Sequence, residues 1–232
     1  WPAFLREGLT GRECEGATLV VVGVGRIGHE VARIARGLGM RVYGVDPVRR
    51  HADIEYLDWA AAAPRADVVV ACMNLTGENH RYFNRSTLSA VKRSCVFVNV
   101  ARGELASTRD LAQLLAEGVL GGVGLDVFED EPRVADALRG LRKETPQELG
   151  RLRELGHLDN VILTPHNAFN TAEAVRRKAD LSAEQIIVTR LPEILATPID
   201  DARDGLARLR HALNATSPPD TSHDVATRED AA

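Results

Sequence analysis

The stretch ATLVVVGVGRIGHEVARIARGLGMRVYGVD, residues 17–46, decides the fold of this chain. It begins with a short β-branched apolar run at 17–22, which is typical of a strand buried on both faces of a parallel sheet. Apolar residues then recur at helical spacing until Gly39 ends the pattern, and RVYGVD at 41–46 indicates a second strand. The stretch therefore predicts a βαβ unit of about 30 residues, the length that such a crossover needs.

Three glycines, Gly23, Gly25 and Gly28, lie between the first predicted strand and the predicted helix. Their G-x-G-x-x-G spacing allows a tight turn, a close approach of the backbone to a pyrophosphate, and close packing of helix on strand. Alone the motif is a weak signal, because glycines gather in many turns. Its position after a strand and before a helix favours dinucleotide binding over a merely structural turn.

Asp46 ends the second predicted strand, eighteen residues after Gly28. A carboxylate at this place accepts hydrogen bonds from the adenosine ribose and repels a 2′-phosphate, which favours NAD over NADP. The structural alternative is a turn residue before Pro47. Arg49 and Arg50 nearby keep NADP open as a second possibility.

The alternation of strands and helices continues downstream. Helical periodicity returns at 86–93 and at 108–118, where Thr108 is the expected N-cap. Strands separated by helices predict an α/β fold, a Rossmann-type doubly wound parallel sheet whose ligands bind beyond the carboxyl ends of the strands. The further strands are predicted at 66–73, 95–100, 122–128 and 160–165.

Residues suited to binding or catalysis follow directly after the predicted strands. The carboxyl ends of parallel strands meet at one edge of a sheet, so these residues are expected to share a ligand-binding edge. Asp126 would lie deeper in that edge and could contact the amide of a nicotinamide. The residues placed there are Gly23, Asp46, Asn74, Arg102, Asp126 and His166.

Arg102 in NVARGE and His166 in LTPHNAF suit the reduction of a 2-keto acid. A planar guanidinium can hold a carboxylate with two hydrogen bonds. An imidazole can protonate a carbonyl oxygen as hydride reaches the carbon, and can take the proton back in the reverse reaction. The alternatives are a surface salt bridge for the arginine and a structural role for the histidine, but their occurrence together with Glu131 behind a nucleotide loop favours catalysis.

Glu131 in DVFEDEP is the acid expected to assist His166. A carboxylate bonded to the far ring nitrogen fixes the orientation of the imidazole and stabilises its protonated form. Glu129 and Asp130 are rival carboxylates, because composition alone does not separate the three neighbouring acids.

The composition is that of an ordinary globular protein. Its 232 residues, 44% hydrophobic and 27% charged, can form one large α/β domain or one domain with an appendage. A net charge of −4 gives no electrostatic reason to expect nucleic acid or an anionic membrane as a partner. Cys14, Cys72 and Cys95 are odd in number and lack CxxC spacing, so no disulfide framework and no thiolate metal site is expected, and a reducing, cytoplasmic location fits best. No residue of the sequence is assigned as a metal ligand.

Four motifs, GVGRIG, NVARGE, GVGLDVFEDEP and LTPH, occur in an order that resembles the D-isomer-specific 2-hydroxyacid dehydrogenases over about residues 8–196. The resemblance implies NAD as cofactor, a small D-2-hydroxy acid or 2-keto acid as substrate, and a homodimer formed through the NAD-binding domains. It assigns the substrate carboxylate to Arg102, the histidine-pairing carboxylate to Glu131, and acid/base catalysis to His166. The segment HNAFNT at 166–171 is closer to the D-lactate dehydrogenase branch. The NAD contacts of the family correspond to Gly23, Gly25, Arg26, Ile27, Gly28, Asp46, Met73, Asn74, Asn79, Val100, Ala101 and Asp126.

The resemblance also implies that the family's N-terminal substrate-binding domain is largely missing. The chain starts at Trp1 rather than at a methionine, and we expect further sequence upstream. Glu131 and His166 are 35 positions apart, more than is usual in the family, which indicates a polar, Arg-rich surface insertion at 133–157. The expected parts are an interdomain helix remnant at 1–10, the NAD-binding Rossmann domain at 11–169, a return helix at 170–199 and a disordered tail at 200–232.

Two functions from different classes follow from these motifs. The first is an NAD-dependent dehydrogenase of D-2-hydroxy acids, which accounts for Arg102, Glu131 and His166 together. The alternative is a catalytically inactive NAD-binding or dimerisation module, which the missing substrate domain favours. A methyltransferase also uses a glycine-rich loop but would leave the three side chains unexplained.

Overall fold

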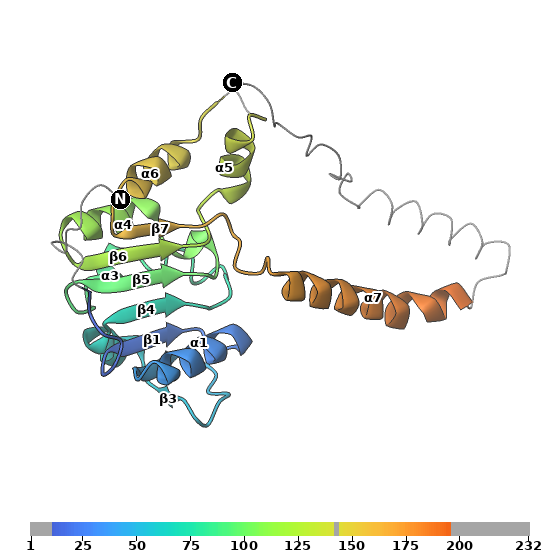
Figure 1. Cartoon of the computed structure of the whole chain (residues 1–232), viewed down its shortest axis with the longest axis horizontal. Helices are drawn as coiled ribbons and strands as arrows, with labels where there is room; N and C mark the ends of the chain where they lie inside the picture. The colour runs from blue at the N-terminus through green and yellow to red at the C-terminus, as the bar shows by residue number, and fades with distance from the viewer. Residues whose placement is uncertain (1–10, 142–143, 196–232) are drawn as a thin grey trace, which may run out of the picture. The chain divides into compact units, whose positions relative to one another are not determined.

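The computed structural model describes residues 11–141 and 144–195, with side chains described up to residue 183. The chain divides into two compact units, Trp1–Phe169 and Asn170–Ala232. The first unit holds the sheet and the helices that cover it (Figure 1). The second unit contributes one described helix.

A seven-stranded sheet organises the first unit, and Figure 1 shows its strands pointing the same way. The strand order is β3-β2-β1-β4-β5-β6-β7, and every pairing is parallel. The chain order reverses between β1 and β4, which is where doubly wound sheets bind ligands. This topology confirms the predicted Rossmann-type fold. The strands are β1 Thr18–Val22, β2 Arg41–Val45, β3 Glu55–Tyr56, β4 Val68–Ala71, β5 Cys95–Asn99, β6 Leu120–Leu125 and β7 Val161–Leu163.

Helices cover both faces of the sheet. Strands such as β1 are apolar on both sides, so both faces must be shielded from water. Successive residues of β1 point to opposite faces, so Val20 and Val21 belong to different buried clusters. Val20 shares its cluster with leucines of α4 (Thr108–Ala116), and Val21 shares its cluster with alanines of α1 (Arg26–Gly37). The remaining helices of this unit are α2 Trp59–Ala62, α3 Arg85–Leu88, α5 Glu131–Leu138 and α6 Gln147–Gly156, with 3-10 turns η1 Ala63–Arg65 and η2 Gly103–Leu105.

Two predicted elements differ from the structure. The helix predicted at 86–93 is the single turn α3, which Asn84 caps and after which the Ser89 hydroxyl donates to the carbonyl oxygen of Arg85 at 2.7 Å. Such local bonds compete with continuation of the helix. The edge strand β3 was not predicted, because two residues carry no periodic signal.

Thr108 is not an N-cap, contrary to the prediction. Ser107 occupies the cap position of α4 without a side-chain hydrogen bond, and Thr108 is the first helical residue. The Thr108 hydroxyl instead donates to the Glu148 carboxylate of α6. Burial raises the pKa of Glu148, although this bond opposes the shift. Thr108 therefore joins two helices rather than ending one.

The segment 133–157 was predicted to be a polar surface insertion, but one face of each of its helices is apolar and buried. Its two helices, α5 and α6, bury Val134, Leu149, Leu152 and Leu155. Leu149, Leu152 and Leu155 recur every three residues, so they share one face of α6, while Arg153 and Glu154 are exposed. The segment is polar in composition but amphipathic in structure.

In the second unit, α7 runs from Ala172 to Leu195. Within the return helix predicted at 170–199, the helical pattern of the sequence runs to about residue 189, and the observed helix continues beyond it, past Pro192. A proline beyond the first turn removes one backbone hydrogen bond and usually kinks or ends a helix, but here the helical backbone continues for three more residues. The predicted remnant at 1–10 and the predicted tail at 200–232 lie outside the described residues.

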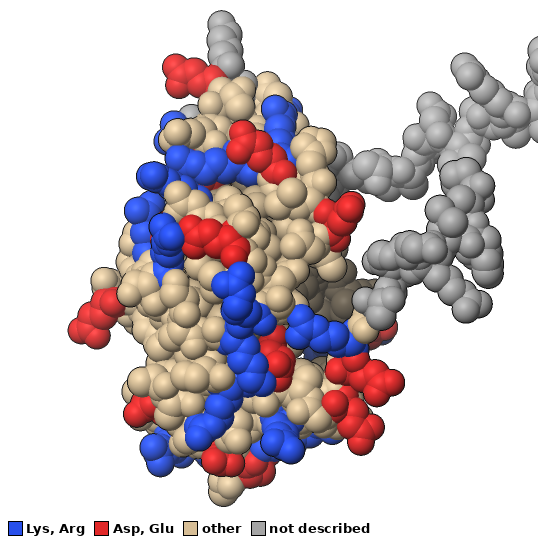
Figure 2. Space-filling model, turned by 90° about the vertical axis from the view of Figure 1, so that its left-hand side faces the viewer, with Lys and Arg blue, Asp and Glu red and all other residues tan. Residues whose placement is uncertain are grey.

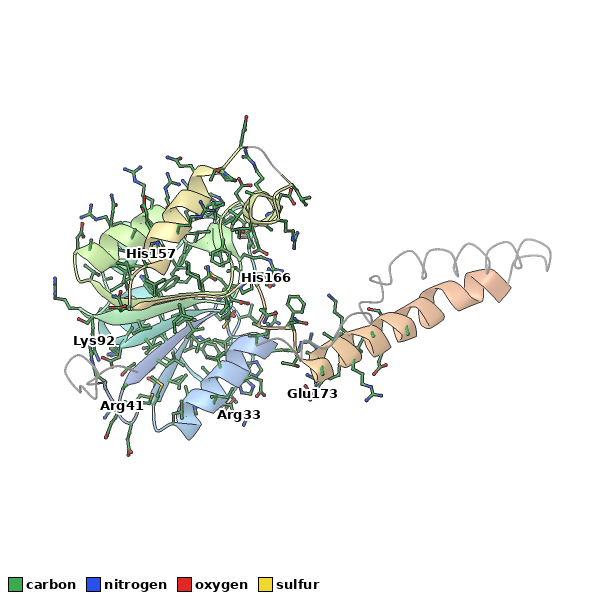
Figure 3. All side chains as sticks on the ribbon, turned by 45° about the horizontal axis from the view of Figure 1, so that its top comes forward. Arg33, Arg41, Lys92, His157, His166 and Glu173 are labelled. Atoms are coloured by element: carbon green, nitrogen blue, oxygen red, sulfur yellow. The ribbon has the colours of Figure 1, made fainter. Side chains whose placement is uncertain are left out.

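The sheet edge opposite the carboxyl ends of the strands carries charges of both signs (Figure 2). Lys92, which Figure 3 labels at this edge, forms an ion pair with Asp67 at 2.8 Å. A mixed surface of this kind does not steer a polyanion toward the protein. Among the described helices, none is long and apolar enough to cross a membrane.

Candidate active site

The glycine-rich turn brings the ends of β1 and β4 into backbone contact. Gly23 has a left-handed backbone, with φ of +91°, and a Cβ atom there would lie 2.3 Å from the backbone nitrogen of Met73. A Cβ atom on Gly28 would lie 2.1 Å from the carbonyl oxygen of Gly23. Both positions therefore require glycine, one for the tight turn and one for the seating of α1 against it.

Gly25 has a different environment, because a Cβ atom there would meet nothing within 4 Å. It caps α1 without a side-chain hydrogen bond, and the first turn of this helix carries no acidic residue. Arg26 and Ile27, the next two residues, are exposed. The helix thus presents uncapped N–H groups and its positive dipole end to open space, which fits a pyrophosphate.

Asp46 is held beside the same turn by two backbone amides. Its Oδ2 accepts from the N–H of Val24 at 2.7 Å, and its Oδ1 accepts from the N–H of Val48 at 2.8 Å. These bonds fix the carboxylate between the glycine turn and the end of β2. The remaining lone pairs of the carboxylate suit the two hydroxyl groups of an adenosine ribose.

The segments after β4 and β5 complete the carboxyl edge of the sheet. Asn79 stabilises the segment after β4. Its side-chain amide donates to the carbonyl oxygen of Asn74 and accepts from the N–H of Thr76, both at 2.7 Å. Val100 is partly buried and Ala101 is buried at the end of β5. Two of the predicted contacts, Asn74 and Asn79, therefore stabilise one loop together.

Asn99 organises the turn that carries Arg102, and sequence reasoning did not identify it. Its side chain is 1% exposed, accepts from the N–H of Ala101 at 3.0 Å and donates to the carbonyl oxygen of Arg102 at 2.8 Å. Arg102 itself is exposed, and its guanidinium donates to the carbonyl oxygen of Ala101 at 2.6 Å. An amide side chain at the end of the otherwise apolar strand CVFVN was the available signal.

The structure brings Glu131 and His166 into direct contact. Nδ1 of His166 lies 2.7 Å from Oε1 of Glu131, and both side chains are about one third exposed. The rival acids have other partners: Glu129 pairs with Arg81 at 3.0 Å, and Asp130 pairs with Arg133 at 3.2 Å. The contact with Nδ1 leaves Nε2 of the imidazole available to a ligand.

His166 lies on the strained turn after β7. Its φ is +51°, in the left-handed region that non-glycine residues rarely adopt. The buried Asp126 holds this turn by accepting from the Thr164 hydroxyl at 2.6 Å and from the N–H groups of Asn167 at 2.8 Å and Ala168 at 3.1 Å. Thr164 was not predicted to take part; its place in TPH, two residues before the histidine, was the available signal.

These bonds also set the charge state of Asp126. Burial raises the pKa of this carboxyl, but the bonds from Thr164, Asn167 and Ala168 outweigh it and leave the pKa below its usual value. Asp126 is therefore ionised when it holds the turn of His166. Asp126, which the sequence analysis predicted to contact the nicotinamide, thus holds the turn of His166 in this structure.

His166 lies at the carboxyl edge of the sheet, whereas Lys92 and Arg41 lie at the opposite edge (Figure 3). The ring of Phe169 meets the imidazole edge-on, with centroids 5.8 Å apart. The predicted side chains thus gather where a doubly wound sheet binds ligands. Arg102 lies on the same edge, on the turn after β5.

Cys72 and Cys95 are poor candidates for nucleophiles. Burial raises the pKa of Cys72 to about 11 and, as the largest effect, that of Cys95 to about 12. Both are therefore neutral thiols near pH 7, and Cys14 is an exposed free cysteine.

Residues 1–168 match the family model described as D-isomer specific 2-hydroxyacid dehydrogenase, NAD binding domain. The chain belongs to this family. Its cofactor is accordingly NAD, and the open space at Gly25 together with the fixed carboxylate of Asp46 fits that dinucleotide.

Individual family members are similar over most of the chain. A glyoxylate reductase from Pyrococcus furiosus is 34% identical over 195 residues, which are 82% of this chain and 53% of the relative. A hydroxypyruvate reductase from Thermotoga maritima is 34% identical over 174 residues, covering 74% of this chain and 52% of the relative. The D-lactate dehydrogenase of Aquifex aeolicus, solved with NAD and lactic acid, superposes with a TM-score of 0.71 at 30% identity, covering 77% of this chain and 55% of that structure. The chain thus spans about half the length of these relatives.

Proposed function

We propose that the protein is an NAD-dependent D-2-hydroxyacid dehydrogenase and that this chain carries its cofactor site and its catalytic side chains. The observation that carries the proposal is the contact of 2.7 Å between Glu131 and His166 at the ligand-binding edge of the sheet. The names of the relatives support the reaction class, since they include reductases of glyoxylate and hydroxypyruvate and a D-lactate dehydrogenase.

His166 would transfer the proton. With Nδ1 facing Glu131, its Nε2 can donate a proton to the carbonyl oxygen of a 2-keto acid and can remove it from the alcohol in the reverse direction. Glu131 would fix the imidazole and stabilise its cation, and Asp126 would hold its turn. The bound dinucleotide supplies or accepts the hydride at C2 of the substrate.

Arg102 would hold the substrate carboxylate. Arg102 is exposed on the turn that Asn99 fixes. Its guanidinium donates a hydrogen bond to the carbonyl oxygen of Ala101. A bidentate pair with a carboxylate would be stronger than this bond, because the acceptor would carry a full charge. Binding of the acid would orient its carbonyl carbon for reaction.

NAD is favoured over NADP by the fixed position of Asp46. Its carboxylate cannot turn away from a 2′-phosphate without losing the bonds from Val24 and Val48. Arg49 and Arg50 are the residues through which NADP could still be accommodated. A ratio of NADPH to NADH affinity near or above one would contradict this part of the proposal.

We extend the proposal to a homodimer formed through the NAD-binding domain. Ile27, Ile34 and Leu38 of the α1 segment are 64, 56 and 54% exposed and recur at spacings of seven and four, which places them on one face. An apolar stripe of this kind is typical of a protein contact. Light scattering on the chain and on Ile34→Asp tests it, because a dimer through α1 should dissociate in the variant.

The expected cytoplasmic location remains part of the proposal. Cys14, Cys72 and Cys95 are free, as is usual where thiols are kept reduced. Localisation of a tagged protein by microscopy or cell fractionation would test it.

The test is NADH oxidation with a panel of pyruvate, hydroxypyruvate, glyoxylate and phenylpyruvate, beside a His166→Ala variant. Turnover that falls by about 100-fold or more in the variant would support the dehydrogenase. The keto acid that wild type reduces best would identify its substrate class. NADH binding is measured separately by fluorescence. Binding without turnover would favour the alternative, an NAD-binding or dimerisation module, and absence of both would contradict the cofactor site.

A further inference from the structure

Three side chains that commonly bind metals meet where α1 faces the connection between β2 and β3. They are His29 of α1 and His51 and Asp53 of the connection, and their donor atoms all lie within 4.8 Å of one another. Nε2 of His29 is 3.1 Å from both carboxylate oxygens of Asp53. The rings of His29 and His51 stack with centroids 3.9 Å apart and planes 5° from parallel.

The backbone around this cluster is well fixed. Ile54, the residue after Asp53, is 6% exposed and belongs to the core beneath α1. Its N–H donates to the carbonyl oxygen of His51 at 3.2 Å, and the N–H of His51 donates to the hydroxyl of Tyr56 at 3.3 Å. The backbone that carries His51 and Asp53 is therefore fixed by the fold, without help from a ligand.

The donor atoms of these three side chains suit one class of metal ion. Two imidazole nitrogens and one carboxylate oxygen suit Zn²⁺ and the neighbouring divalent transition metals. Mg²⁺ and Ca²⁺ prefer oxygen ligands alone. Three protein ligands would leave a fourth position of a tetrahedral ion to water.

We propose that His29, His51 and Asp53 bind a divalent transition metal ion, with Zn²⁺ as the reference ion, between α1 and the β2–β3 connection. The sequence predicted no metal site, because these residues have no ligand spacing along the chain and meet only through the fold. The site is separate from the proposed catalytic side chains, and the inference does not depend on the proposed function.

Binding would require a small rearrangement of side chains. Ligand atoms on a tetrahedral zinc ion are about 3.3 Å apart, so the widest separations in the cluster must shorten. One imidazole must also turn out of the stack, because a metal lies in the plane of each ring that binds it. The side chains of His29 and Asp53 are 28 and 53% exposed, which leaves them room to turn.

Arg36 is the competitor for this site. Its guanidinium donates to Oδ2 of Asp53 at 2.7 Å and also to the Asp53 carbonyl oxygen. A bound cation would have to displace the first of these bonds and would be repelled by the guanidinium. The alternative to a metal site is therefore an ion-pair network in which Arg36 and His29 fasten Asp53.

The experiment is a titration of the whole chain with Zn²⁺ in competition with a chromophoric chelator. Wild type should bind one ion at this site, and His51→Ala and His29→Ala should each weaken that binding by more than about 100-fold, since even outer-shell partners contribute 10–100-fold. The matched control is His157→Ala, an exposed histidine after α6, which should bind as wild type does. Equal binding by all variants, or no stoichiometric binding by wild type, would overturn the proposal.

A second variant separates the metal site from the ion-pair network. Arg36→Gln removes the competing cation, so it should bind Zn²⁺ several-fold more tightly than wild type. A metal-free network predicts no such gain. Thermal unfolding provides the folding control: Zn²⁺ should raise the Tm of wild type and His157→Ala but leave that of His51→Ala unchanged, because only proteins that keep the site gain binding energy in the folded state.

Discussion

Gly103 packs directly against the backbone of Phe128: a Cβ atom on Gly103 would lie 1.9 Å from the carbonyl carbon of Phe128 and 2.5 Å from the nitrogen of Glu129. Gly103 follows Arg102, and Phe128 lies three residues before Glu131. The turn that carries the arginine and the turn that carries the glutamate are therefore fixed to each other through their backbones.

Gly103→Ala should destabilise the protein by about 2–3 kcal/mol or more, because backbone atoms cannot yield as a flexible side chain can. Urea unfolding measures the loss. The matched control is Gly37→Ala at the end of α1, where a Cβ atom would meet nothing within 4 Å. Equal stability of the two variants would show that the close approach has no energetic weight.

Gly25→Ala should separate cofactor binding from folding. A Cβ atom at Gly25 meets no protein atom within 4 Å, and the lower entropy of the unfolded chain opposes the loss of glycine at the N-cap of α1, so the free energy of unfolding should change by less than about 1 kcal/mol. The same Cβ atom would occupy space that the pyrophosphate needs, so the Kd for NADH should rise about tenfold or more, which is roughly 1.4 kcal/mol. NADH fluorescence titration checks this, and wild-type affinity in the variant would contradict the assignment of the loop.

The elements that sequence could predict are those whose signal is local or periodic. β1 and α1 follow from one apolar run and one helical repeat, and the place of His166 at the ligand-binding edge follows from the rule that parallel strands end at one edge. The pairing of Glu131 with His166 came from the chemistry of an imidazole base and from the family resemblance. Composition alone did not separate Glu131 from Glu129 and Asp130, and only the family resemblance assigned the pairing to Glu131. In the structure Glu131 is the carboxylate that contacts the imidazole, whereas Glu129 contacts Arg81 and Asp130 contacts Arg133.

Features that depend on contacts between distant elements were out of reach. Thr108 has the sequence context of an N-cap, but its hydroxyl bonds to Glu148 because α6 packs beside it. The burial of Leu152 depends in the same way on where the insertion folds back. The meeting of His29 with His51 leaves no trace in their spacing.

Glu131→Gln should lower kcat for keto acid reduction by about 10–100-fold, because the amide no longer supports the charged imidazole. The KM for the keto acid should change little, since the carboxylate of the substrate is assigned to Arg102. Glu129→Gln is the matched control, because Glu129 bonds to Arg81 at 3.0 Å instead of His166. Steady-state kinetics of the two variants decides: equal losses in kcat would remove the special role of Glu131.

Asp126→Asn should destabilise the protein most at neutral pH. The carboxylate accepts hydrogen bonds from Thr164, Asn167 and Ala168, and the amide group of asparagine would set a donor against donors, which costs about 1–3 kcal/mol. Because the folded pKa of Asp126 lies below the usual value of 3.8, its stabilisation is complete above that pH and is lost as the pH falls through the folded pKa.

The difference in unfolding free energy between wild type and Asp126→Asn should therefore be largest at neutral pH and should shrink as the pH falls below 3.8 and through the lowered folded pKa, where wild type also loses the charge. Urea unfolding at a series of pH values measures it, with Asp159→Asn, an exposed carboxylate before β7, as the control. Taking the difference cancels the acid sensitivity that both proteins share. A difference that stays constant or grows toward low pH would mean that Asp126 does not hold the His166 turn as an anion.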